Sequence, residues 1–295
     1  MVSFRRADSR NLYLPLALRA YDTNVDQSSW EQIGFNPIGQ IQIDYTELSQ
    51  SRSEIVESLR GAGKGTPASL RNLDLFVRAI ENDITRNGSY FGWIALDAGT
   101  STVAITFRGT HGFDEWLKGA LILPVPYPYE NGDLGLVHAG FLIVYRSVRQ
   151  STADLLRRIS VGQYNKLLIC GHSLGAAVAT LSSPDIYQQI GRHAVPEVRS
   201  FASPRPADAV FSRTLADRGL SVLTHRNRFD IVPDLPMVPY FHPDTIALIG
   251  GGELFNPKVS HDLVASYQTG LDALTSDDSV FGGLPSHPYI YSETG

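Results

Sequence analysis

The chain has little of several features that define large classes of protein. Its 295 residues contain one cysteine, Cys170, which excludes an internal disulfide framework and a metal site built from several cysteines. Charged residues make up only 19%, and the net charge of −5 excludes the basic surface that binding to nucleic acid requires. No uninterrupted apolar run reaches the roughly 18 residues of a membrane span. Because aromatic residues make up 10%, the chain is not an intrinsically disordered one, and we expect a soluble, mildly acidic globular protein.

The first twenty residues carry a faint likeness to a signal peptide, because basic residues precede the apolar run 12–18. Asp8 interrupts the basic region, and Arg19 breaks the pattern of small residues at a cleavage site. We therefore interpret this segment as a short buried helix that contains Leu14, Ala17 and Leu18. The compartment stays open, since a single cysteine suits either side of a membrane.

From residue 89 onward, short apolar segments alternate with segments of helical periodicity, which favours an α/β sheet covered by helices on both faces. No repeat, low-complexity block or linker divides the chain. The expected strands are 40–48, 90–97, 102–107, 167–170, 198–202, 222–225 and 245–249, and the expected longer helices are 53–60, 68–86, 140–159 and 262–274.

The most informative segment is Gly171–Gly175, which has the sequence Gly-His-Ser-Leu-Gly and the form G-x-S-x-G. An apolar strand precedes it and a helix-forming run follows, which is the context that this motif requires. To present Oγ at the end of the strand, the backbone at Ser173 must turn sharply, and the two glycines relieve the crowding around it. The start of the helix also directs N–H groups toward a developing oxyanion. We predict that Ser173 is a nucleophile, and the alternative is a structural tight turn.

A serine nucleophile needs an orienting carboxylate and a base, which follow it along the chain in this architecture. Asp230 comes shortly after the expected strand 222–225, where a loop at the edge of the sheet would carry the acid. We predict Asp230 as the acid, and Asp234 is the second candidate.

For the base we predict His261, which directly precedes the last expected helix and could reach back to the serine. His242, which precedes a proline, is the second candidate, and His287 in the last twenty residues is the third.

Several sequence blocks carry a resemblance, and they span roughly residues 89–274. They are 103–110 (VAITFRGT), 123–128 (LPVPYP), 137–142 (VHAGFL), 171–175 (GHSLG), 230–233 (DIVP) and the region of His261. In this order they resemble the class 3 lipase family, the fungal lipase-like α/β hydrolases. The resemblance implies an α/β-hydrolase fold with a mostly parallel central sheet. We expect residues 1–295 to form a single domain, with a core at 89–274, N-terminal elements at 1–88, and a tail or surface loop at 276–295.

The resemblance also assigns roles to residues. It implies that Ser173 is the nucleophile, Asp230 the acid and His261 the base, and it places the oxyanion hole at the backbone N–H groups of Leu174 and Thr110, with the Thr110 hydroxyl as a third donor. The residues support the second N–H independently, because a strand that ends in Arg-Gly-Thr can supply it.

Lipases of this family carry a helical lid after the oxyanion strand, and the equivalent segment here is 111–119 (HGFDEWLKG). Phe113, Trp116 and Leu117 share one face of a helix at spacings of three and four residues. Such a helix could open the site and contact a lipid surface. The alternative is a fixed surface helix with Trp116 packed in the core.

Two further residues give expectations that a structure can test. Arg108, in the block 103–110, is expected to brace the oxyanion loop through a buried ion pair. Pro184 falls within the helix after the serine, and it is expected to kink or end that helix.

Together these observations predict a serine carboxylesterase of the lipase type that hydrolyses acyl (glycerol) esters through an acyl-enzyme. Its expected partner is an ester substrate, most simply a lipid, with transient contact to a lipid interface through the lid and no contact with nucleic acid. The residue types give no reason to invoke a metal or another cofactor. A feruloyl esterase, a phospholipase A1-like enzyme and a non-catalytic binding module remain the alternatives, and the oligomeric state stays open.

Overall fold

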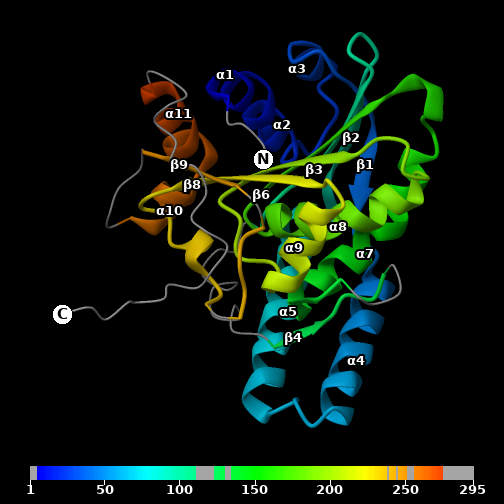
Figure 1. Ribbon diagram of the computed structural model, residues 1–295, viewed down its shortest axis with the longest axis vertical. Coiled ribbons are helices and arrows are strands. Elements are labelled where there is room, and N and C mark those ends of the chain that lie inside the picture. The colour runs from blue at the N-terminus through cyan, green and yellow to red at the C-terminus, as the bar shows by residue number, and fades with distance from the viewer. Residues whose placement is uncertain are drawn as a thin grey trace.

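A seven-stranded sheet organises the part of the chain that the structure describes (Figure 1). The structure is a computed structural model, which describes residues 5–110, 123–129, 134–237, 239–243, 245–250 and 256–274. Across the sheet the strands are β1 (Asn36–Gln42), β2 (Tyr90–Asp97), β3 (Thr102–Phe107), β6 (Lys166–His172), β7 (Pro196–Phe201), β8 (Ser221–Asn227) and β9 (Thr245–Ile249). A separate antiparallel pair is formed by β4 (Pro124–Pro126) and β5 (Leu136–His138).

The order of the strands brings the loops after β3, β6 and β8 to one edge of the sheet. Strands β1, β2 and β3 pair in antiparallel fashion, whereas β3, β6, β7, β8 and β9 are all parallel. Phe107 pairs with Gly171, and His172 pairs with Phe201, so the carboxyl ends of neighbouring parallel strands lie side by side. Parallel strands need crossover connections, which place helices over the faces of the sheet.

Alternate residues of the central strands enter different apolar cores on the two faces of the sheet. Ile105 and Phe107 of β3 belong to the larger core with α7 and α8, whereas Ala104 faces a smaller core that contains Leu16 of α2. Figure 1 shows the two groups of helices on either side of the strands. The expectation of a mostly parallel sheet with helices on both faces is confirmed. The helices are α1 (Arg6–Asp8), α2 (Leu14–Arg19), α3 (Gln27–Glu31), α4 (Tyr45–Gly61), α5 (Pro67–Asn87), α7 (Ala139–Leu156), α8 (Leu174–Gln189), α9 (Ala209–Asp217), α10 (Pro257–His261) and α11 (Thr269–Ala273).

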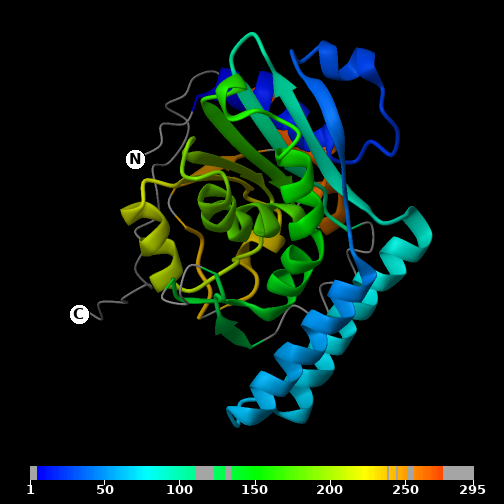
Figure 2. The ribbon, with the colours of Figure 1, turned by 90° about the vertical axis from the view of Figure 1, so that its right-hand side faces the viewer.

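Helices α4 and α5 lie alongside each other and extend beyond the sheet (Figure 2). The start of α4 corrects the sequence-based boundaries, because the expected strand 40–48 ends at Gln42. Asp44 is the reason: its carboxylate accepts hydrogen bonds from the N–H groups of Thr46 (2.8 Å) and Glu47 (3.1 Å) and caps a helix there. The helix expected at 53–60 therefore begins eight residues earlier, at Tyr45.

Of the two effects expected of Pro184, a kink or an end of the helix, the second is wrong, because α8 continues to Gln189. Proline cannot donate to the carbonyl four residues before it, which here is that of Thr180. The hydroxyl of Ser183 donates to that carbonyl instead (2.9 Å). A local side-chain hydrogen bond therefore satisfies the acceptor that the proline leaves open.

The ends of the described chain pack against each other. Leu14 and Ala17 of α2 are fully buried, as expected, in a small core that also contains Tyr267 and Leu271, whereas Leu18 is only partly buried against it. The expected final helix 262–274 is divided into a π-helical segment, Leu263–Gln268, and α11. Within the described ranges, no helix combines the length and the apolar character that crossing a membrane would need.

Candidate active site

Ser173 lies between β6 and α8 in a backbone conformation that residues with a side chain seldom adopt. Its φ is 56° and its ψ is −126°, and it is 5% exposed. The flanking glycines are required by space: a Cβ on Gly171 would lie 2.4 Å from the carbonyl oxygen of Gly175, and a Cβ on Gly175 would lie 2.3 Å from that of Phe107. Strain of this kind, held by a close-packed strand and helix, is typical of a functional site. The sharp turn expected from the sequence is therefore present.

The structure joins Ser173, His261 and Asp230 in one chain of hydrogen bonds. Oγ of Ser173 lies 2.8 Å from Nε2 of His261, and Nδ1 of His261 lies 2.9 Å from Oδ2 of Asp230. His261 is the last residue of α10 and is 7% exposed, while Asp230 follows β8 and is 1% exposed. Because a carboxylate only accepts, Nδ1 of His261 carries a proton and Nε2 is free to accept the serine proton.

Two further donors fix the Asp230 carboxylate. The backbone N–H of Val232 donates to Oδ1 (3.0 Å), and the hydroxyl of Tyr267 donates to Oδ2 (2.7 Å). Burial and the nearby Asp230 raise the pKa of Tyr267 well above its ordinary value, so the phenol stays protonated and remains a donor. Tyr267 was not identified from the sequence, because it gives no signal apart from lying six residues after His261.

The second candidates for the acid and the base, Asp234 and His242, make their hydrogen bonds and ion pairs with other residues than Ser173 and His261. The carboxylate of Asp234 lies 2.7 Å from the guanidinium of Arg226 and 3.5 Å from that of Arg205. The ring of His242 donates through Nε2 to the carbonyl of Pro233 (2.7 Å). The third candidate for the base, His287, falls outside the described residues, as do the three lid residues Phe113, Trp116 and Leu117.

The loop after β3 is braced by a buried ion pair, as expected. Arg108 is fully buried, and its Nη1 lies 2.7 Å from Oδ2 of Asp83 and 2.8 Å from the carbonyl oxygen of Gly109. In a trans peptide the C=O and N–H groups point in opposite directions. Since the Gly109 carbonyl faces Arg108, the N–H of Thr110 points away from the guanidinium.

Leu174 carries a backbone N–H group directly after the serine. It is the first residue of α8, and the first four N–H groups of a helix have no acceptor within the helix. Gly175 packs against the carbonyls of Phe107 and Arg108, so the start of α8 and the end of β3 are in direct contact. Gly109 also lies close to the serine, since a Cβ on it would be 2.9 Å from Cβ of Ser173.

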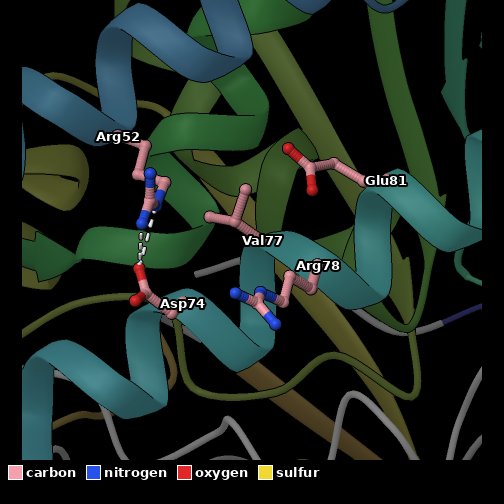
Figure 3. A pocket seen from close by; sticks show the side chains of 5 residues that line it. All are labelled: Arg52, Asp74, Val77, Arg78 and Glu81. Atoms are coloured by element: carbon pink, nitrogen blue, oxygen red, sulfur yellow. Dashed lines mark hydrogen bonds and ion pairs between the residues drawn. The ribbon is translucent and has the colours of Figure 1, made fainter.

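Outside this site, the features of the described residues that could take part in the chemistry would be a metal-binding group or a polar pocket. The described residues contain no group of three or more His, Cys, Asp or Glu side chains that could hold a metal ion. A polar pocket lies between α4 and α5, and Figure 3 shows Arg52 of α4 directed at Asp74 of α5, with Arg78 and Glu81 alongside. The ion pair between Arg52 and Asp74 links the two helices. This pocket contains none of the residues around Ser173.

The chain has the α/β-hydrolase fold, and solved structures support this assignment. Lipase II from Rhizopus niveus superposes with a TM-score of 0.61 at 20% sequence identity, over 84% of this chain and 82% of that one. A triacylglycerol lipase, described as having a serine-protease triad at its catalytic centre, gives a TM-score of 0.59 at 20% identity over 82% of this chain and 79% of that one. At this level of identity the likeness establishes the fold.

Sequence comparisons show a likeness to one family with this fold. The family model described as Lipase (class 3) matches residues 104–240. A lipase from Rhizomucor miehei is 31% identical over 146 residues, which are 48% of this chain and 40% of that protein. Phospholipase A(1) DAD1 from Arabidopsis thaliana is 28% identical over 244 residues, which are 72% of this chain and 54% of that protein. The chain thus spans about half or less of the length of these relatives. The resemblance to class 3 lipases is confirmed.

Proposed function

We propose that the protein is a serine carboxylesterase of the lipase type, with Ser173 as nucleophile, His261 as base and Asp230 as orienting acid. The observation that carries this proposal is the continuous chain of hydrogen bonds from the Ser173 hydroxyl through His261 to Asp230, 2.8 and 2.9 Å long. These distances lie within the range needed for proton transfer to a general base.

The reaction follows from this arrangement. As Oγ of Ser173 bonds to the ester carbonyl carbon, its proton passes to Nε2 of His261. The carbonyl oxygen becomes an oxyanion, which the N–H groups of Leu174 and Thr110 and the Thr110 hydroxyl stabilise. The imidazolium of His261 then protonates the leaving alkoxide, the carbon–oxygen bond breaks, and the alcohol departs.

Water completes the cycle by the same route. His261 takes a proton from water, whose oxygen bonds to the carbonyl carbon of the acyl-enzyme. The tetrahedral intermediate collapses, Ser173 recovers its proton from His261, and the carboxylic acid leaves. Throughout, Asp230 stays ionised and stabilises the positive charge on the imidazole.

Lipid esters are the proposed substrate class. The names of the relatives support this choice: a lipase from Rhizomucor miehei and a phospholipase A(1) from Arabidopsis thaliana. The plant relative aligns over the larger part of this chain, which makes phospholipase A1 activity the second candidate. We retain the amphipathic segment with Phe113, Trp116 and Leu117 as a proposed lid that contacts the lipid interface. We also propose that the N-terminal elements and the core form one domain, and the pairing of β1 with β2 supports this.

A substrate panel tests the proposal. The wild-type protein should hydrolyse p-nitrophenyl esters in a series of increasing acyl length, and the panel includes a long-chain triacylglycerol, phosphatidylcholine and methyl ferulate. Lipase-type activity predicts hydrolysis of long-chain acylglycerols, whereas preference for phosphatidylcholine or methyl ferulate would assign the alternatives. Ser173→Ala should lower turnover about a million-fold, as in analogous triads. Ester hydrolysis that survives this substitution would contradict the proposed nucleophile.

A further inference from the structure

His172, the residue between Gly171 and Ser173, is buried and uses both ring nitrogens. Its Nδ1 lies 2.6 Å from the hydroxyl of Tyr21, and its Nε2 lies 2.9 Å from the backbone carbonyl oxygen of His261. The rings of His172 and His261 also contact each other, with centroids 4.8 Å apart. His172 is therefore held between the N-terminal segment and the residue that carries the proposed base.

These partners determine which nitrogen of His172 carries the proton. A carbonyl oxygen can only accept, so Nε2 of His172 carries a hydrogen and donates a hydrogen bond to the backbone carbonyl of His261. Burial and the neighbouring His261 ring lower the pKa of His172 well below its ordinary value, so the ring is neutral. Nδ1 therefore has a lone pair, and the Tyr21 hydroxyl donates to it.

The Tyr21 hydroxyl extends this chain of hydrogen bonds to the oxyanion loop, the segment after β3 that contains Gly109 and Thr110. Because its hydrogen is directed at His172, its oxygen is left to accept, and the backbone N–H of Gly109 lies 3.0 Å away. A Cβ on Gly109 would lie 2.7 Å from this hydroxyl and 2.9 Å from Cβ of Ser173, so the contact is close on both sides. The hydrogen bonds run in one direction, from Gly109 N–H to Tyr21, from Tyr21 O–H to His172, and from His172 Nε2–H to the His261 carbonyl.

We infer that Tyr21 and His172 are positioning residues that hold the oxyanion loop and the backbone of His261 in a fixed relation to Ser173. This inference rests on the proposed function, because it assigns these residues to the same reaction. Neither side chain touches the reacting atoms in this mechanism. They act on the peptides beside Thr110 and at His261, where a displacement of about 1 Å can cost about a hundredfold in rate.

Kinetics of matched variants test the inference. Tyr21→Phe removes only the hydroxyl, and we expect kcat to fall about ten- to a hundredfold with KM within about twofold of the wild type. His172→Gln can keep a donor for the His261 carbonyl but has no acceptor at the Nδ1 position that faces Tyr21, and it should show a loss of similar size. Because the two act through one chain, the double variant should be no worse than the poorer single variant.

Tyr90→Phe is the matched control. The Tyr90 hydroxyl donates to the backbone carbonyl of Tyr21 (3.2 Å), so its loss loosens the same segment without breaking the chain through His172. We expect kcat of this variant to stay within about twofold of the wild type. A Tyr21→Phe enzyme that matches the Tyr90→Phe control, or losses that multiply in the double variant, would overturn the positioning role.

A second measurement does not depend on activity. Nitrogen-15 NMR of the histidine rings should show His172 protonated at Nε2 and unprotonated at Nδ1, without titration from about pH 5 to about pH 8. Protonation at Nδ1, or titration in this range, would overturn the inference even in an active enzyme. If the wild type hydrolyses no ester, the proposed function fails, while the NMR experiment still decides the hydrogen-bond chain.

Discussion

Replacing Asp230 by asparagine keeps the shape of the side chain, removes its charge and gives one of its two terminal atoms hydrogens to donate. The N–H of Val232 faces one terminal atom, so that atom must remain an oxygen. The amide nitrogen then occupies the Oδ2 position, which faces Nδ1 of His261 and the hydroxyl of Tyr267. The Tyr267 hydroxyl can rotate, but His261 must shift its proton from Nδ1 to Nε2. In that tautomer Nε2 cannot accept the proton of Ser173.

The expected loss is therefore that of a triad whose histidine holds the wrong tautomer, about 10⁴-fold in kcat. This corresponds to about 5 kcal/mol of transition-state stabilisation. The assay is steady-state hydrolysis of a soluble p-nitrophenyl ester, with the thermal unfolding midpoint measured beside it to show that the variant is folded.

Asp234→Asn is the matched control, because Asp234 is the neighbouring carboxylate that the sequence alone could not exclude. It is partly exposed and pairs with Arg226, so we expect kcat within about twofold of the wild type. An Asp230→Asn enzyme that keeps more than about a tenth of the wild-type kcat would refute the assignment, as would an equal loss in the control.

Three other predictions follow from the geometry. Thr110→Val should lower kcat on the order of a hundredfold if the hydroxyl is a third oxyanion donor, and unchanged turnover would remove it from that role. Gly175→Ala places a Cβ 2.3 Å from a backbone carbonyl oxygen, so we expect the free energy of unfolding to fall by about 1–3 kcal/mol or more. Gly162→Ala is the control, because its Cβ would meet nothing within 4 Å, and we expect it to fold normally. Equal unfolding midpoints for the two variants would contradict the prediction. Burial lowers the pKa of His225 to about 3, whereas the unfolded chain has a value of about 6.5. Between these two pH values the unfolded state binds more protons than the folded state. The free energy of unfolding should therefore decrease as the pH falls through this window. Denaturant titrations at several pH values give the free energy of unfolding, which should fall less steeply with decreasing pH in His225→Gln than in the wild type. An equally steep fall in the variant would contradict this prediction.

The local parts of the site could be predicted because their causes lie close together in the sequence. The apolar strand, Gly171, Ser173 and Gly175 are contiguous, and the steric reason for the glycines holds in the structure. The buried pair of Arg108 and Asp83 was expected from one partner alone, since a charge in an apolar block needs a counter-ion.

Of the long-range parts, Asp230 and His261 could be ranked first but not decided from the sequence, because several residues share the same local pattern, and Tyr21 could not be found at all. Asp230 and Asp234 both follow β8, and only the path of the chain directs the first to His261 and the second to Arg226. Tyr21 lies more than 150 residues before Ser173 and meets His172 only because α2 packs across β3 and β6. The start of α4 was missed for a different reason: the alternation of residues 40–48 favoured a strand, and the capping carboxylate of Asp44 overrode it.

The central claim, that a buried hydroxyl at the β6–α8 turn is the nucleophile, is tested most directly by fluorophosphonate labelling followed by peptide mapping. The account predicts a single stoichiometric adduct on Oγ of Ser173, slower labelling of Asp230→Asn, and none of Ser173→Ala. A folded wild-type protein that takes up no label, or takes it up at another residue, would contradict it.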